Sequence, residues 1–331
     1  MEDAGVIELT TADPNGFDPA RDLSEVVVGL RDARLRWRVA HERHAEHGSF
    51  GFPSRQSLGR IVNLLGAVLF PLRLGPPELN PGNEDAYVEA TLESALSQLA
   101  AQVRQEIIYA RRPKKVEDVE PEVQAIVGAL ARALPDLRAL LDTDVRAAYG
   151  GDPAARSVDE VLLCYPCVTA VIHHRIAHRL YQLGAPLVAR IIAEIAHSRT
   201  GIDIHPGAKI GPSFFIDHGT GVVIGETAII GERVRLYQAV TLGARSFSAD
   251  DDGTLTKGEA RHPIIEDDVV IYAGATILGR VTIGRTSVIG GNVWLTHSVP
   301  PGSHVRQAHA TLAIVSPGQE PAEPDPAADD W

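Results

Sequence analysis

Three short segments in the C-terminal half of this sequence concentrate the side chains that could do chemistry. They read Asp203-Ile204-His205-Pro206, Asp217-His218-Gly219-Thr220-Gly221 and Arg261-His262-Pro263. A histidine titrates near neutral pH, so it can remove a proton from an alcohol. A carboxylate that accepts the other ring N–H fixes the tautomer and stabilises the imidazolium. The residue types therefore favour general-base chemistry at a histidine with an acidic neighbour.

An apolar residue at every sixth position predicts the scaffold that holds these segments. One run comprises Ile204, Ile210, Ile216, Val222, Ala228, Val234 and Val240, and a second comprises Ile265, Ile271, Ile277, Ile283, Ile289 and Leu295. A helix repeats after about 3.6 residues and a strand after two, so neither produces this period. Hexapeptide repeats are typical of a parallel β-helix, in which residues three hexads apart stack on successive coils. The pattern thus predicts that Val222 stacks on Ile204, and Val240 on Val222.

This scaffold places Asp203 and His218 on neighbouring coils, because they are separated by nearly three hexads. At that separation a carboxylate–imidazole pair is plausible. The residues alone leave two other interpretations open. The histidines could lie at the surface or at a subunit contact, or His205, His218 and His262 could bind zinc as in trimeric carbonic anhydrases.

The sequence resembles the serine O-acetyltransferases over about residues 150–305. The similarity rests on GIDIHPGAKIGPSFFIDHGTGVVIGETAIIG, VTLGA and RHPIIEDDVVIYAGATILG, and on GDPAARS further upstream. The resemblance implies an α+β protein with an N-terminal all-helical domain followed by a left-handed parallel β-helix. It also implies transfer of acetyl from acetyl-CoA to the L-serine hydroxyl, which gives O-acetylserine for cysteine biosynthesis.

The resemblance implies catalytic roles for three residues. His218 is similar to the family's general base, which deprotonates the serine hydroxyl for direct attack on the thioester. Asp203 resembles the carboxylate that orients this base. His262 matches a second active-site histidine that holds the substrate or assists proton transfer.

The resemblance also implies binding roles. Arg261 would pair with the serine carboxylate, whereas Asp152 and Asp217 would contact the ammonium group. Small residues would line a groove for acetyl-CoA, namely Gly243, Ala244, Ala273, Gly274 and Gly291. No metal ion is implied.

The chain divides by pattern into four parts. We expect a flexible leader (1–20), a helical domain (21–200), a β-helix domain (201–310) with an inserted loop (245–261), and a disordered tail (311–331). Within the helical domain, apolar residues recur at helical spacing through Glu84–Ile108 and Pro121–Ala148. Pro135 is expected to end or kink the second of these helices.

Composition limits the function classes. The chain has 331 residues, of which 31 are basic and 43 acidic, and its net charge of −12 argues against general nucleic-acid binding. The first residues lack the basic and apolar regions of a signal peptide, and the longest apolar stretch, Ile61–Leu74, is too short to span a bilayer. With two cysteines, these features indicate a cytoplasmic protein without membrane association.

Partners follow from the scaffold and the resemblance. Hexapeptide prisms pack as trimers, and the helical domain could join two trimers into a hexamer. Many members of the family end in an isoleucine that inserts into O-acetylserine sulfhydrylase, whereas this sequence ends Ala328-Asp329-Asp330-Trp331, which puts that complex in doubt. The competing functions are an acetyltransferase for another acceptor (homoserine, a sugar or a xenobiotic), a trimeric zinc lyase and a noncatalytic scaffold.

Overall fold

The computed structural model describes residues 19–41, 51–111, 118–246, 256 and 258–307. The chain forms two compact units, residues 1–51 and residues 52–331. In the first unit the described residues form helix α1 (Pro19–Ala40). Almost all of the predicted leader, the whole predicted tail and most of the inserted loop lie outside the described residues.

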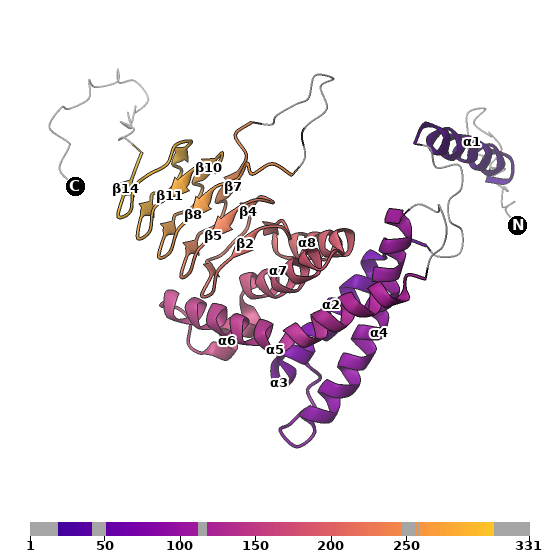
Figure 1. Ribbon diagram of the computed structural model, residues 1–331, viewed down its shortest axis with the longest axis horizontal. Helices are drawn as coiled ribbons and strands as arrows, with labels where there is room; N and C mark the ends of the chain where they lie inside the picture. Colours follow the sequence, from indigo (N-terminus) through magenta and orange to yellow (C-terminus); the bar gives the residue numbers. More distant parts are fainter. Residues whose placement is uncertain (1–18, 42–50, 112–117, 247–255, 257, 308–331) are drawn as a thin grey trace, which may run out of the picture. The chain divides into compact units, whose positions relative to one another are not determined.

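The second unit begins with helices and ends with strands, as the sequence predicts (Figure 1). Its helices are α2 (Arg55–Leu69), α3 (Pro71–Leu74), α4 (Glu84–Arg111), α5 (Glu120–Gly151), α6 (Val158–Cys164), α7 (Pro166–Gln182) and α8 (Pro186–Thr200). The helix predicted over Glu84–Ile108 is confirmed as α4, whose residues Ala95, Leu99 and Val103 are fully buried. None of the helices in the described part of the chain has the length and apolar composition needed to cross a membrane.

Of the two expectations for Pro135, that it ends or kinks its helix, the first is wrong and the second stays a prediction. Helix α5 continues through Pro135 to Gly151. Leu134 before the proline and Leu141 after it are both buried, whereas Pro135 itself is exposed. Packing of this apolar face on both sides of the proline outweighs the hydrogen bond that the proline removes.

Three parallel sheets wind into a left-handed β-helix of hexapeptide repeats. The strands are β1 (Asp203–Ile204), β2 (Lys209–Ile210), β3 (Phe215–Ile216), β4 (Val223–Ile224), β5 (Ile229–Ile230), β6 (Arg235–Leu236), β7 (Thr241–Gly243), β8 (Ile264–Ile265), β9 (Val270–Ile271), β10 (Thr276–Leu278), β11 (Thr282–Ile283), β12 (Val288–Ile289), β13 (Trp294–Leu295) and β14 (His304–Val305). Sheet A has the order β1-β4-β7-β10-β13, sheet B β2-β5-β8-β11, and sheet C β3-β6-β9-β12-β14. Successive strands of one sheet therefore belong to successive coils, which Figure 1 shows as a stack.

The predicted stacking of Val222 on Ile204 is wrong by two residues. Ile204 pairs with Ile224 and not with Val222. Between the next two coils the spacing is three hexads, as the pattern predicts, so Val240 does stack on Val222. The first coil is longer because its last corner, residues 217–222, has two residues more than the next corner of that edge, residues 237–240. Val222 remains fully buried, since the position two residues before each inward strand residue also faces the interior. The chemistry-bearing segment around His218 is thus the irregular corner of the prism.

A buried ion pair attaches the helices to the first coil. Arg175 on α7 makes two hydrogen bonds of 3.1 Å to the carboxylate of Asp144 on α5. Arg175 also donates to the carbonyl of Gly211 at 2.7 Å, and Asp144 accepts from the backbone N–H of Phe214 at 2.9 Å. Both charged side chains are about 95% buried, being 4% and 5% exposed. The pair holds the C-terminal part of α5, which ends beside Asp152, against the prism.

Candidate active site

The corner at residues 217–222 presents His218 to solvent. His218 has a φ of 60° and is followed by Gly219 with a φ of 95°. A Cβ atom on Gly219 would lie 2.5 Å from Cδ1 of Ile202, so this tight turn requires glycine. The left-handed conformation of a non-glycine residue such as His218 costs of order 1 kcal/mol and is common at functional sites. The His218 side chain is 73% exposed and free to meet a ligand.

Asp217 lies beneath His218 in a charged cluster. Its Oδ1 is 3.9 Å from Nε2 of His218, and its Oδ2 accepts a hydrogen bond of 2.8 Å from Nη2 of Arg235. The Arg235 guanidinium lies 4.7 Å from the ring centre of Tyr237. Asp217 is buried, and Arg235 compensates its negative charge.

Folding brings Asp152 to the same region although it is distant in the sequence. Asp152 caps the C-terminus of α5 and accepts a hydrogen bond from the Tyr165 hydroxyl and one of 2.8 Å from the N–H of Ala154. The Tyr165 hydrogen bond is the largest cause of a lowered pKa at Asp152, and Arg235 and His218 lie close enough to add to it. The same hydrogen bond raises the pKa of Tyr165 to about 12. Asp152 therefore offers a carboxylate that stays ionised near His218.

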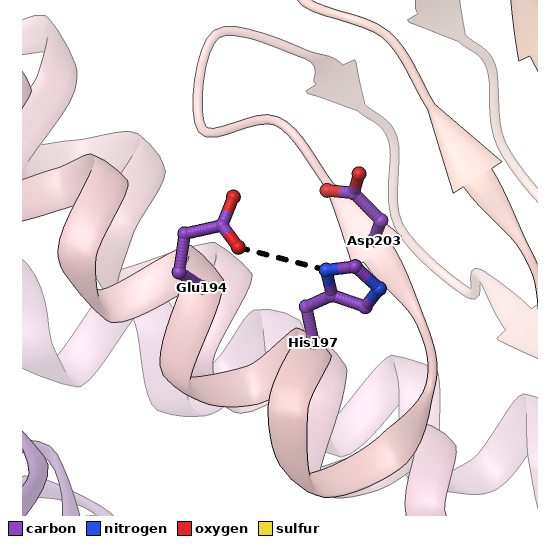
Figure 2. Close-up of side chains that lie close together, drawn as sticks. All are labelled: Glu194, His197 and Asp203. Atoms are coloured by element: carbon purple, nitrogen blue, oxygen red, sulfur yellow. Dashed lines mark ion pairs between the residues drawn. The ribbon is translucent and has the colours of Figure 1, made fainter. Parts of the chain in front are cut away.

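Asp203 lies with a different histidine. Figure 2 shows Asp203 on β1 converging with Glu194 and His197 of α8, and their ligand atoms all lie within 4.8 Å of one another. The Nδ1 atom of His197 is 3.6 Å from Oε2 of Glu194. Among the described residues, this is a group that could hold a metal ion. No hydrogen bond or ion pair of the described residues joins Asp203 to His218, so their pairing stays a prediction.

Arg261 lies at another corner of the prism, where the inserted loop returns to sheet B. Its Nη2 atom donates a hydrogen bond of 2.8 Å to Glu226, and the other carboxylate oxygen of Glu226 accepts one of 3.1 Å from the Tyr181 hydroxyl. Glu226 thus connects the guanidinium to α7. The arginine is about one-quarter exposed, so one side of it stays available to an anion.

His262 is buried against the same corner. Thr227 donates its backbone N–H to Nδ1 of His262 at 3.1 Å, and the Thr227 hydroxyl lies 2.9 Å from the same nitrogen. That hydroxyl oxygen also accepts from the backbone N–H groups of Arg261 at 2.9 Å and His262 at 3.1 Å. Burial, followed by the charge of Arg261, lowers the pKa of His262 to about 4. The ring is therefore neutral at pH 7.

The expected site residues divide between two edges of the prism. The edge between sheets C and A comprises residues 217–222, 237–240, 272–275 and 290–293. The described residues of the edge between sheets A and B are 205–208, 225–228, 244–246, 258–263 and 279–281. His218, Asp217, Ala273, Gly274 and Gly291 belong to the C–A edge, and Asp152 lies near it. Arg261, His262 and Ala244 belong to the A–B edge, and Gly243 ends the strand that leads into it. Within one chain, sheet A separates the two groups.

A cavity of about 200 Å³ opens beside Arg261 at the A–B edge. Its lining residues include three arginines, Arg245, Arg261 and Arg280, one acidic residue, Glu259, and Gly279. Gly279 donates its N–H to the carbonyl of Gly243 at 3.0 Å, so the cavity adjoins one of the small residues expected to line the acetyl-CoA groove. The arginines favour an anionic ligand here.

Sequence reasoning missed the residues that hold the expected ones in place. These are Tyr165, Tyr181, Glu226, Thr227 and Arg235. The inserted loop hides the relation between Glu226 and Arg261, because it adds residues between two corners that lie on adjacent coils. The tyrosines lie on or beside α7 and carry no sequence signal for their partners.

Comparisons with known proteins find relatives that match most of the chain. The family model described as bacterial transferase hexapeptide (six repeats) matches residues 262–297. A plasmid-encoded serine acetyltransferase of Synechococcus elongatus is 58% identical over 264 residues, which cover 78% of this chain and 83% of that protein. The crystal structure of Entamoeba histolytica serine acetyltransferase 1 in complex with L-cysteine is 38% identical, with a TM-score of 0.66, and the match covers 74% of this chain and 86% of that one. A Neisseria gonorrhoeae serine acetyltransferase in complex with serine is 28% identical, with a TM-score of 0.50, over 77% of this chain and 96% of that one.

Proposed function

The chain belongs to the serine acetyltransferase family, and from this premise we propose that it transfers the acetyl group of acetyl-CoA to the hydroxyl of L-serine. The products are O-acetylserine and CoA. The observation that carries the proposal is the 58% identity over most of the chain with a serine acetyltransferase. The same membership favours acetyl transfer over the zinc-lyase and scaffold alternatives.

In this proposal His218 is the general base. Its exposed imidazole takes the hydroxyl proton as the serine oxygen attacks the thioester carbonyl. The tetrahedral intermediate then collapses, the carbon–sulfur bond breaks, and the CoA thiolate takes up a proton from the imidazolium. The nearby carboxylate of Asp217, 3.9 Å from Nε2, supports the imidazolium, and Asp203 is proposed to orient the ring.

The charged ends of serine are proposed to bind to side chains of opposite sign. Arg261 suits the carboxylate, because Glu226 anchors one of its nitrogens and leaves the guanidinium partly exposed. Asp152 and Asp217 suit the ammonium group. Such charge-assisted contacts distinguish an amino acid from a neutral sugar.

The division of these residues between two edges supports an active site formed by two copies of the chain. The C–A edge of one copy would supply the base and the ammonium-binding carboxylates. The A–B edge of a neighbouring copy would supply Arg261 and His262. Three such contacts would close a trimer around an axis that runs between the three prisms, and the helical domains could then pair two trimers.

Acetyl-CoA is proposed to lie between the same two edges. Small residues at both edges let a pantetheine arm approach the backbone closely, and the cavity with three arginines suits the phosphates of CoA. No metal ion takes part in this mechanism. We propose the cytoplasm as the compartment, in line with the free thiols of Cys164 and Cys167.

Incubation of the full chain with L-serine and acetyl-CoA tests the function directly. We expect O-acetylserine by mass spectrometry and an equal amount of free CoA thiol. Homoserine and a hexose serve as control acceptors and should yield far less thiol. Equal or faster acetylation of either control would reject serine as the acceptor.

A further inference from the structure

A tight turn brings the chain from the end of α8 back to the first strand of the prism. Gly201 caps the helix with a φ of 70° and donates its N–H to the carbonyl of His197 at 2.8 Å. The Thr200 hydroxyl accepts the N–H of Ile202 at 3.2 Å, and Ile202 is only 1% exposed. Asp203 then begins β1, which pairs with β4. The backbone is therefore fixed at both ends of the turn.

Three side chains with metal-binding atoms converge where this turn closes. Glu194 and His197 are three residues apart on α8, so they share one face of the helix. Asp203 of β1 lies opposite them (Figure 2), and the ligand atoms of all three lie within 4.8 Å of one another. Two ligands bound at about 2.1 Å to one divalent ion lie at most about 4.2 Å apart. Side-chain movements of less than about 1 Å would therefore close the group around an ion.

The donor atoms and their surroundings favour a reversibly bound transition metal. One imidazole and two carboxylates form a donor set that suits Zn²⁺ and similar divalent ions. Arg190 pairs with Oε1 of Glu194 at 2.6 Å, which leaves Oε2 facing Nδ1 of His197 at 3.6 Å. Arg55 donates to the backbone carbonyl of Glu194 at 3.2 Å, and these two cations weaken the attraction for an ion. The side chains of Glu194 and His197 are 36% and 45% exposed, so an ion and its remaining water ligands can enter.

The corner that carries His218 lies against the same turn. Gly221 donates its N–H to the carbonyl of Gly201 at 2.8 Å, and a Cβ atom on Gly201 would lie 3.4 Å from Cγ2 of Thr220. Asp203, which is proposed to orient His218, is thus within reach of an ion held by α8. A bound cation neutralises this carboxylate and adds positive charge near the imidazole, and both effects disfavour the imidazolium.

We propose that Glu194, His197 and Asp203 form an inhibitory site for a divalent transition-metal ion such as Zn²⁺. Binding of the ion is independent of catalysis, whereas its inhibitory effect rests on the proposed function. The bound ion withdraws Asp203 from His218 and slows removal of the hydroxyl proton. Arg261, proposed to bind the serine carboxylate, belongs to the other edge of the prism. The ion therefore lowers kcat more than it raises KM for serine.

Calorimetric titration of the untagged, metal-free chain with zinc chloride at pH 7 tests the binding site. Residues around a metal's ligands typically contribute about 10–100-fold to affinity, and a ligand itself should contribute no less. We therefore expect His197→Ala and Glu194→Gln each to weaken one class of zinc site by at least about tenfold. His304→Ala is the matched control, because this exposed histidine lies on β14 at the other end of the prism. Equal zinc affinity and stoichiometry in the unmodified chain and His197→Ala would overturn the proposal.

Initial rates with and without zinc test the inhibition. O-acetylserine is followed by mass spectrometry, because the thiol of released CoA itself binds zinc. We expect zinc to lower kcat of the unmodified chain and of His304→Ala, and excess EDTA to restore it. His197→Ala should keep the basal rate and require at least about tenfold more zinc for the same inhibition. Inhibition of His197→Ala at the same zinc concentration would overturn the inhibitory role. If the unmodified chain forms no O-acetylserine, the proposed function fails, and the titration still decides the metal site separately.

Discussion

Replacing Gly225 with alanine tests whether the backbone beneath His262 determines the rate of acetyl transfer. The added Cβ would lie 2.0 Å from Cδ2 of the ring, whereas carbon atoms in contact are about 3.5–4 Å apart. The ring must therefore move by more than about 1 Å, which breaks its hydrogen bonds to Thr227. Gly225 does not have a left-handed φ, so alanine strains the ring and not the backbone.

Misplacement of a catalytic group by about 1 Å costs of order 10²-fold in rate, and we expect kcat of Gly225→Ala to fall by about that factor. Overpacking should also destabilise the fold by about 1–3 kcal/mol, visible as a lower Tm. The assay is steady-state release of CoA thiol with saturating serine. Gly66→Ala is the control, because its Cβ would meet Leu74 at an ordinary 3.8 Å. A Gly225→Ala enzyme with unchanged kcat would refute the reasoning.

Four further outcomes are expected. His218→Ala should lower kcat by about 10²–10⁴-fold, the usual contribution of a general base, with an unchanged circular dichroism spectrum because the side chain is exposed. Arg261→Ala should raise KM for serine more than KM for acetyl-CoA in steady-state kinetics; an equal effect on both would contradict its role. Arg175→Leu should lower the free energy of unfolding by about 3–5 kcal/mol in urea titrations, since it leaves Asp144 buried without its partner. Dialysis against EDTA should leave the rate unchanged, and a loss restored by zinc would contradict a metal-free mechanism.

The hexad pattern predicts the β-helix correctly but not the strand register of its first coil. The hexad period was sufficient to predict a parallel β-helix, because few other folds repeat every six residues. After Ile216, the period placed each inward strand residue two positions too early. Val222 and Ile224 are both apolar and buried, so the sequence pattern does not distinguish which of them pairs with Ile204. The positive φ angles of His218 and Gly219, which accommodate the longer corner, come from the three-dimensional path of the chain.

In the candidate site, too, the sequence predicts some residues and only the structure reveals the others. Motif resemblance singled out Asp152, Asp217 and His218, and the structure brings these near one another at the C–A edge. The neighbours that control them, such as Tyr165 and Arg235, lack a motif of their own. A hydrogen bond between side chains depends on the packing of helices against coils, which no local spacing encodes.

The sequence by itself determined the β-helix, the helical half and the chemistry of the acidic and imidazole groups, because repeat period and residue type are local properties. Only the tertiary structure decided that Arg261 and His262 lie on a different edge from His218, that Asp203 adjoins His197, and that Thr227 fixes the His262 tautomer. These relations depend on which coil stacks on which and on where a loop returns, and such long-range contacts form only when the whole chain is folded.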